Sequence, residues 1–189
     1  MVSTGDVIEN PVLGDTIRIL KAPADTDGEL LQAEISLVPN AQGPPLHIHP
    51  TLEDRFVARS GSLGVQIDGV TRLLAPGEAA VAPPGVPHRF WNAGDGPTRF
   101  IAEVRPASPG FIAFIETLYG LARDGKTNDQ GLPNPLQTAV LFRAYKHDIM
   151  PASPPRFVQP IVFGTMAVLG RSLGFRAYYP KYARAGSLQ

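Results

Sequence analysis

Three of the four histidines lie in two short segments that could together bind one metal ion. His47 and His49 are separated by a single residue, so in a β-strand their imidazoles would point to the same side. His88 could add a third nitrogen ligand from a second segment, residues 77–92, in which glycine and proline form tight turns. Because the chain has no cysteine, any metal must be held by histidine, aspartate or glutamate.

The part of the chain that carries these histidines has the pattern of many short β-strands. Runs of β-branched and aromatic residues alternate with turn signals such as Asp68-Gly69 and Pro76-Gly77. Short strands without intervening helices favour a β-sandwich or barrel. The pattern predicts strands at residues 16–20, 30–38, 55–59, 63–67, 71–74, 79–82, 88–92 and 99–104.

After Pro106 the pattern changes to that of helices. Segments 111–123, 135–147 and 157–173 have helical length and apolar residues at three-to-four spacing. We expect their apolar stripes to pack on the barrel or across a dimer. The stretch 157–170 is too interrupted to span a membrane and is expected to be a buried helix. The sequence thus predicts a β-barrel over residues 1–105 and a helical extension over residues 106–189.

Composition restricts the partners of the chain. The 189 residues fit about one domain, and 17 basic residues balance 17 acidic ones, so no overall positive charge attracts nucleic acid or an acidic membrane. Residues 1–20 lack the basic start and continuous apolar run of a secretory signal. We therefore expect a cytoplasmic protein with neither nucleic acid nor membrane as partner.

The second histidine segment resembles the second motif of the cupin superfamily. That motif consists of Gly, five residues, Pro-x-Gly, two residues, His, three residues and Asn. Gly77, Pro83, Gly85, His88 and Asn92 fill all of its positions. The glycines and the proline are expected to shape turns, and Asn92 to bond turn backbone.

The first segment is similar to the first cupin motif, with one position open. His47, His49 and Gly61 match, whereas the family's leading Gly is displaced from position 41 to Gly43. Six residues separate Asp54 from Gly61, the spacing at which the family has its carboxylate, although that acid is normally Glu. Glu53 fits a shorter spacing from His49 and is the alternative. Because adjacent strand residues face opposite ways, only one of the two acids can point inward unless a bulge intervenes.

The cupin resemblance implies a mainly β fold, a double-stranded β-helix or jelly-roll-like barrel, with a C-terminal helical extension. It implies a metal site of His47, His49, His88 and Asp54, with Glu53 as the alternative to Asp54. The ion would be a divalent transition metal, with Fe, Mn, Ni, Zn, Co and Cu not distinguished. The resemblance also favours a homodimer.

The implied function is small-molecule chemistry at this metal, with a ligand inside the barrel. A metal-dependent dioxygenase is the leading hypothesis. A non-catalytic ligand-binding or sensing protein and a metal-dependent isomerase are the alternatives. An apolar or aromatic ligand is favoured if the interior is lined by the apolar residues of the strands, namely Phe56, Val65, Ile67, Phe90 and Trp91.

Overall fold

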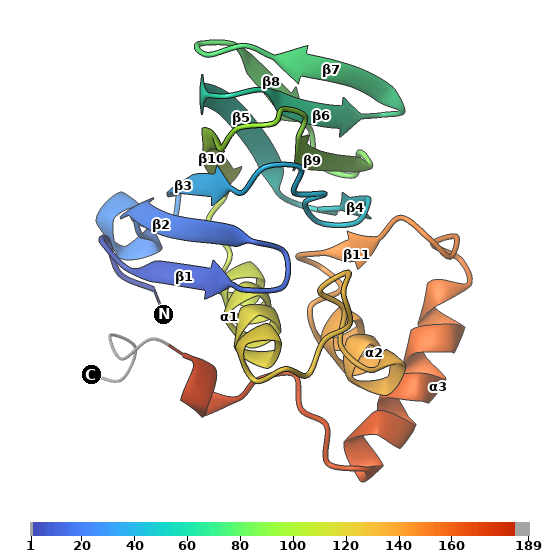
Figure 1. Cartoon of the computed structure of the whole chain (residues 1–189). Coiled ribbons are helices and arrows are strands. Elements are labelled where there is room, and N and C mark those ends of the chain that lie inside the picture. Colours follow the sequence, from blue (N-terminus) through green and yellow to red (C-terminus); the bar gives the residue numbers. More distant parts are fainter. Residues whose placement is uncertain (1, 184–189) are drawn as a thin grey trace.

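The structure is a computed structural model that describes residues 2–183. Its strands are β1 (Val7–Asn10), β2 (Asp15–Lys21), β3 (Leu31–Leu37), β4 (His47–Ile48), β5 (Glu53–Ser60), β6 (Leu63–Ile67), β7 (Val70–Leu74), β8 (Ala79–Ala82), β9 (His88–Asn92), β10 (Thr98–Arg105) and β11 (Met150–Pro151). One antiparallel sheet has the order β1-β2-β3-β10-β5-β8, and the other the order β11-β4-β9-β6-β7 (Figure 1). The predicted fold class, mainly β with C-terminal helices, is confirmed.

The strands follow the alternation of the sequence. Along β5 every second side chain is buried, including Phe56 and Ala58, because successive strand residues point to opposite faces. Inward-facing residues of both sheets form one apolar core, whose fully buried members include Phe56, Leu63, Val65, Leu74 and Phe100. All the predicted strands are present, and none of their ends differs by more than two residues. The short strands β1, β4 and β11 were not among the predicted strands.

Asn92, at the end of β9, connects several turns at one end of the barrel. Its amide nitrogen donates to the carbonyls of Val38 and Gly96, and its Oδ1 accepts from the Gly94 N–H and the Thr98 hydroxyl, all at 2.7–3.0 Å. The side chain is 2% exposed, so water cannot replace these bonds. The predicted role of Asn92 in bonding turn backbone is therefore confirmed.

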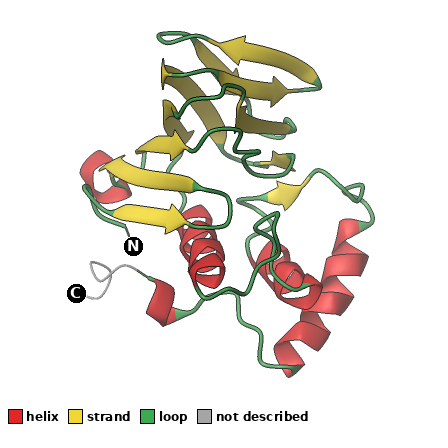
Figure 2. Cartoon of the chain, in the orientation of Figure 1, coloured by secondary structure: helices red, strands yellow, loops and turns green. Residues whose placement is uncertain are grey.

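The C-terminal part contains α1 (Pro109–Arg123), α2 (Pro135–Ala144) and α3 (Gln159–Ser172). They gather at one end of the barrel, beside β1, β2 and β11 (Figure 2). Helix α1 begins at Ser108, whose hydroxyl accepts the N–H groups of Gly110 and Phe111. Its apolar face joins Ile8 and other residues of β1–β3 in a second core cluster. Helices α2 and α3 pack on each other around a third set of residues, Ala139, Val140 and Ala167.

Helix α3 is not the buried helix that the sequence predicted. Only its narrow face with Ala167 and Gly170 packs closely on α2, while Ile161 and Val168 are each 73% exposed and Leu169 is 52% exposed. The prediction was wrong because an apolar stretch is buried only where a neighbour covers it, and α3 has one helical neighbour. Among the described residues, no helix combines the length and the apolar character needed to cross a bilayer.

We predict that Asn92→Ala lowers the free energy of unfolding by about 2–4 kcal/mol, because the Gly94 N–H and two carbonyls lose their partners in a buried setting. Chemical denaturation monitored by circular dichroism measures this change. The matched control is Gln42→Ala, which removes an exposed amide with one hydrogen bond and should change stability by less than about 0.5 kcal/mol. Equal effects of the two substitutions would contradict the role given to Asn92.

Candidate metal centre

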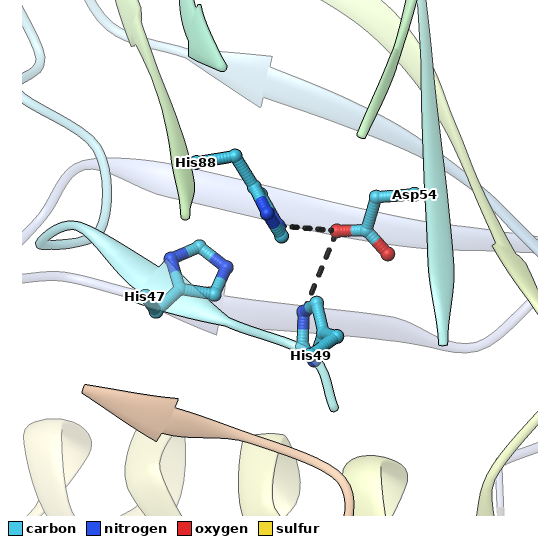
Figure 3. A group of neighbouring side chains, drawn as sticks. All are labelled: His47, His49, Asp54 and His88. Carbon is cyan, nitrogen blue, oxygen red and sulfur yellow. Dashed lines mark ion pairs between the residues drawn. The ribbon is translucent and has the colours of Figure 1, made fainter. Parts of the chain in front are cut away.

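His47, His49, Asp54 and His88 meet at one point between the two sheets (Figure 3). One potential ligand atom from each side chain lies within 4.8 Å of the others. The three imidazole ring centroids are 4.5–5.3 Å apart. The sequence-predicted group of three histidines and one carboxylate is therefore brought together by the fold.

Strand pairing places the two histidine segments side by side. His47 on β4 is the register partner of His88 on β9, and His49 follows directly after β4. The N–H of Gly85 also donates to the carbonyl of His49 at 2.7 Å. Gly85 has a φ of +80°, which favours glycine. This turn therefore links the two motifs through the backbone.

Gly43 permits the close approach of the first segment to β9. It has a φ of +63°, and a Cβ at this position would lie 1.9 Å from the carbonyl oxygen of Phe90. No other residue type fits without moving the backbone. The displaced glycine of the first motif therefore has a steric function beside the strand that carries His88.

Asp54, not Glu53, supplies the carboxylate of the cluster. Asp54 is 7% exposed, and its Oδ2 lies 3.3 Å from Nε2 of His88 and 3.5 Å from Nε2 of His49. Glu53 lies on the opposite, partly exposed face of β5, as strand alternation requires. The spacing from Gly61 that favoured Asp54 thus agrees with the position of its side chain.

Each histidine is held through Nδ1 by a backbone carbonyl. His47 contacts the carbonyl of Pro45 at 2.9 Å, and His88 that of Val86 at 2.8 Å. His49 contacts the carbonyl of Asp148 at 2.5 Å. A carbonyl accepts only, so each Nδ1 must carry the proton, and in the neutral ring each Nε2 keeps a free lone pair. This arrangement is typical of histidines that bind metals.

The atoms that face the centre lack hydrogen-bond partners. Among the described residues, Nε2 of His49, Nε2 of His88 and Oδ1 of Asp54 are buried without a hydrogen bond. Unpartnered buried polar atoms are costly, and a cation surrounded by these lone pairs would remove the cost. The residues therefore fit a divalent transition metal, but they do not distinguish one metal from another.

The electrostatic environment keeps His47 and Asp54 in the state that binds a cation. His49 differs: burial alone would lower its pKa, but the adjacent Asp54 outweighs burial and raises it, so a cation must displace a proton from His49. Burial, followed by the proximity of His49 and His88, lowers the pKa of His47 to about 3. Burial alone would raise the pKa of Asp54, but the adjacent His49 and His88 outweigh it and hold the pKa well below its usual range. At neutral pH, His47 is therefore neutral and Asp54 ionised, as metal binding requires.

The helical part also reaches the cluster, which the sequence analysis did not foresee. Asp148, whose carbonyl holds His49, lies just before β11, and β11 pairs with β4. The ring of Phe111 on α1 packs edge-on against His49, with centroids 4.8 Å apart. No local signal in the sequence marks a backbone carbonyl 99 residues away as a partner of His49.

An apolar cavity of about 140 Å³ opens onto the cluster. His47, His49 and Asp54 form part of its wall, and most of the rest is aliphatic or aromatic. An apolar cavity of ~150 Å³ holds a ligand such as benzene. The lining comes from β1–β3, β5, β9, β10, α1 and the loop between α1 and α2; it includes Ile17, Ala33, Phe56, Phe90, Phe111 and Leu118.

Only part of the predicted lining is correct. Phe56 and Phe90 line the cavity, whereas Val65 and Ile67 contribute to the barrel core. Trp91 points to the other side of β9, where the guanidinium of Arg89 lies 5.0 Å from its ring centroid. The error arises because alternation fixes which residues share a face, but not where along that face the cavity lies.

Two antiparallel sheets face each other and enclose a buried cluster of three histidines and one carboxylate. This arrangement defines the class of protein as a β-barrel with a site of the kind that binds metals. Residues 33–103 match the family model described as "Cupin domain". This segment runs from β3 to β10 and includes both histidine segments. The chain thus contains a cupin domain.

Curated relatives are distant. "Probable oxidoreductase patJ" from Aspergillus clavatus is 28% identical over 152 residues, which cover 75% of this chain and 46% of the relative. "Protein SchB" from Streptomyces halstedii is 28% identical over 109 residues, covering 58% of this chain and 79% of the relative. The chain spans about half the length of the patJ proteins it matches. Among solved structures, KdgF from Halomonas sp. is 21% identical, with a TM-score of 0.49 over 56% of this chain and 90% of that chain.

We predict that Asp54→Ala weakens Ni(II) or Co(II) binding by at least about tenfold, because one anionic ligand is lost. Glu53→Ala is the matched control and should change the affinity by less than about twofold, since Glu53 lies on the opposite face. Calorimetric titration of both variants measures the effect. A larger loss for Glu53→Ala would reverse the assignment, and no loss for either would leave a three-histidine site.

Proposed function

We propose that this chain is a metal-dependent cupin that binds a small, largely apolar molecule beside a His47, His49, His88 and Asp54 metal centre and catalyses its oxidation. One observation carries the proposal: three of these four residues form part of the wall of an otherwise apolar cavity. A metal bound there would be open to a ligand in the cavity, unlike a closed structural site.

Three imidazoles and one carboxylate suit a divalent transition ion. Four protein ligands leave about two positions of an octahedral ion for other ligands. When bound, a redox-active ion would supply the electron-transfer chemistry of an oxygenase. The chain's own residues orient the imidazoles through the three backbone carbonyls and exclude water through the apolar walls, including Phe56 and Phe111.

The names of several relatives support oxidation over other reactions. The patJ proteins and virH from Hypocrea virens carry the name "Probable oxidoreductase", and virH is 25% identical over 155 residues. Other relatives are named germin-like proteins. The isomerase alternative receives less support, because sugars or keto acids need several polar groups and the cavity wall is mostly apolar.

The second candidate function is ligand binding without turnover. The same cavity and centre would serve it, because an apolar wall of the kind seen here contributes to affinity whether or not a reaction follows. Oxygen consumption separates the two functions.

We predict that catechols, β-diketones or 2-keto acids change the visible absorption of the Fe(II) and Ni(II) forms, because their paired oxygens can fill two open positions. With the Fe(II) form in air, at least one class should be consumed together with O₂ faster than with the His88→Ala variant. An oxygen electrode and absorption spectroscopy measure both steps. Spectral change without O₂ consumption would favour the binding protein, and no spectral change for any class would contradict both functions at this site.

We also propose that the protein is a homodimer in which the exposed face of α3 packs against the same face of a second copy. Ile161, Val168 and Leu173 are 63–73% exposed on one helix, and large apolar patches on a monomer mark interaction sites. Between Gln159 and Gly170 the helix has no charged residue. Arg171 is the charged residue of α3 and lies in its last turn, so a second copy packed antiparallel on this face would place the two arginines at opposite ends of the contact.

We predict that Val168→Asp yields monomers where the unmodified chain is a dimer, because a buried unpaired carboxylate opposes association. Light scattering at micromolar concentration measures the mass. The matched control is Val70→Asp on β7, a valine that is 63% exposed but distant in sequence from α3, and it should leave the dimer intact. A monomeric unmodified chain would refute the homodimer.

A further inference from the structure

Asp15 and Tyr119 form a second polar group in the wall of the cavity. The Tyr119 hydroxyl donates a hydrogen bond to Oδ2 of Asp15. Asp15 on β2 is 4% exposed and Tyr119 on α1 is 5% exposed, and both line the cavity with apolar neighbours such as Ile17. Neither residue belongs to a cupin motif or to the segment that matches the cupin model.

The other carboxylate oxygen of Asp15 has no partner. Among the described residues, Oδ1 of Asp15 is buried and accepts no hydrogen bond. Burial raises the pKa of Asp15 to about 6, and the bond from Tyr119 offsets only part of this effect. A structural link between β2 and α1 needs one carboxylate oxygen. The second oxygen is therefore available to a further donor.

The pair lies away from the metal centre, at another part of the cavity wall. Helix α1 connects the two places: the Phe111 ring packs on His49, and the Tyr119 hydroxyl bonds to Asp15. Eight residues of α-helix separate Phe111 and Tyr119, which corresponds to about 12 Å at a rise of ~1.5 Å per residue. A metal–oxygen bond of about 2 Å and a hydrogen bond of about 2.8 Å would take up part of that distance and leave roughly 7 Å, the scale of one aromatic ring with oxygen groups at its opposite ends.

We propose that Asp15 and Tyr119 are a second anchoring point for the ligand of the cavity, and that this ligand is an apolar, ring-containing molecule with a hydroxyl group far from its metal-binding oxygens. The hydroxyl donates to Oδ1 of Asp15. The inference rests on the proposed function for the identity of the metal-binding end, but the contact with Asp15 does not require the metal.

The chemistry of the pair favours a neutral hydroxyl over other groups. A carboxylate or phosphate would be repelled by Asp15, and the hydroxyl of Tyr119 already donates its hydrogen to Oδ2 of Asp15. An ammonium group would have to lose its hydration in an apolar cavity, which is costly even beside a carboxylate. A phenolic or alcoholic O–H satisfies the free oxygen without burying a second charge. The aromatic residues of the wall suit a ring between the two ends.

Two probes that differ by one hydroxyl test the proposal: benzoylacetone and its 4-hydroxyphenyl analogue. Both present a β-diketone to the metal end, and only the analogue has a distal hydroxyl. Calorimetric titrations use the full chain, with Ni(II) and without metal. We expect the analogue to bind about tenfold more tightly than benzoylacetone, as a hydrogen bond to a charged group would give.

The preference should fall towards unity in Asp15→Asn, which keeps the shape of the side chain but not its charge. It should persist in the matched control Glu9→Gln, an exposed acid on the neighbouring strand β1. Tyr119→Phe should retain a preference for the analogue, because both carboxylate oxygens remain. A thermal melt of each variant confirms that it is folded.

Several results would overturn the proposal. One is equal affinity for the two probes, and another is absence of binding by either. A third is a preference that Asp15→Asn leaves unchanged. A fourth is an Asp15→Asn variant that has a changed melting temperature but unchanged affinities for both probes. That result would mean that Oδ1 of Asp15 pairs with the amide of Asn10, its register partner, rather than with a ligand.

The metal-free titration separates this proposal from the proposed function. A hydroxyl preference in the metal-free chain, together with no metal binding, would support the anchor and contradict the metal-dependent function. Metal binding and diketone binding without any hydroxyl preference would contradict the anchor alone.

Discussion

The burial of three imidazoles and one carboxylate in an apolar interior is the constraint around which this barrel is built. Water cannot satisfy the polar atoms of these side chains, so the chain must do so or leave them for a cation. Backbone carbonyls take the three Nδ1 atoms. The Nε2 atoms of His49 and His88 and one oxygen of Asp54 remain unpartnered and face the same point. The backbone thereby fixes the orientation of the three imidazoles and directs each Nε2 towards the centre of the cluster.

Because of this constraint, the helical part does more than bury one end of the barrel: it also orients His49. Two of the three carbonyls come from residues two positions before the histidine they hold, Pro45 for His47 and Val86 for His88. The third comes from Asp148, and the Ser108 hydroxyl at the start of α1 donates to the side chain of the same residue. A shift of α1 or β11 would therefore move the carbonyl that orients His49. The metal-site-like cluster and the helical part are thus linked through Asp148, Phe111 and the pairing of β11 with β4.

Much of the fold and cluster could be predicted because the signals are local. Strand alternation and turn residues located eight of the eleven described strands to within two residues. The spacing of both motifs named His47, His49, Asp54 and His88. The spacing to Gly61 favoured Asp54 over Glu53, and the period of a strand meant that only one of the two acids could face inward. The contributions that were missed, Asp148 and Phe111 at His49, join residues far apart in sequence. The burial of α3 was wrongly predicted because hydrophobicity reports a need for cover without naming the neighbour.

The residues that line the cavity come from separate parts of the sequence. For this reason the cupin motifs locate the four-residue cluster but do not identify a ligand of the cavity. The metal end lies within residues 33–103, the segment that matches the cupin model. Asp15 precedes that segment and Tyr119 follows it, and both belong to the β2 and α1 elements that close the cavity beyond the barrel. Because catalytic metal chemistry is shared among many substrates, selection must come from groups that contact the rest of the molecule. In the proposed ligand site those groups, Asp15 and Tyr119, come from β2 and α1, outside the segment that matches the cupin model, so on this proposal the ligand could change there while His47, His49, Asp54 and His88 stay the same.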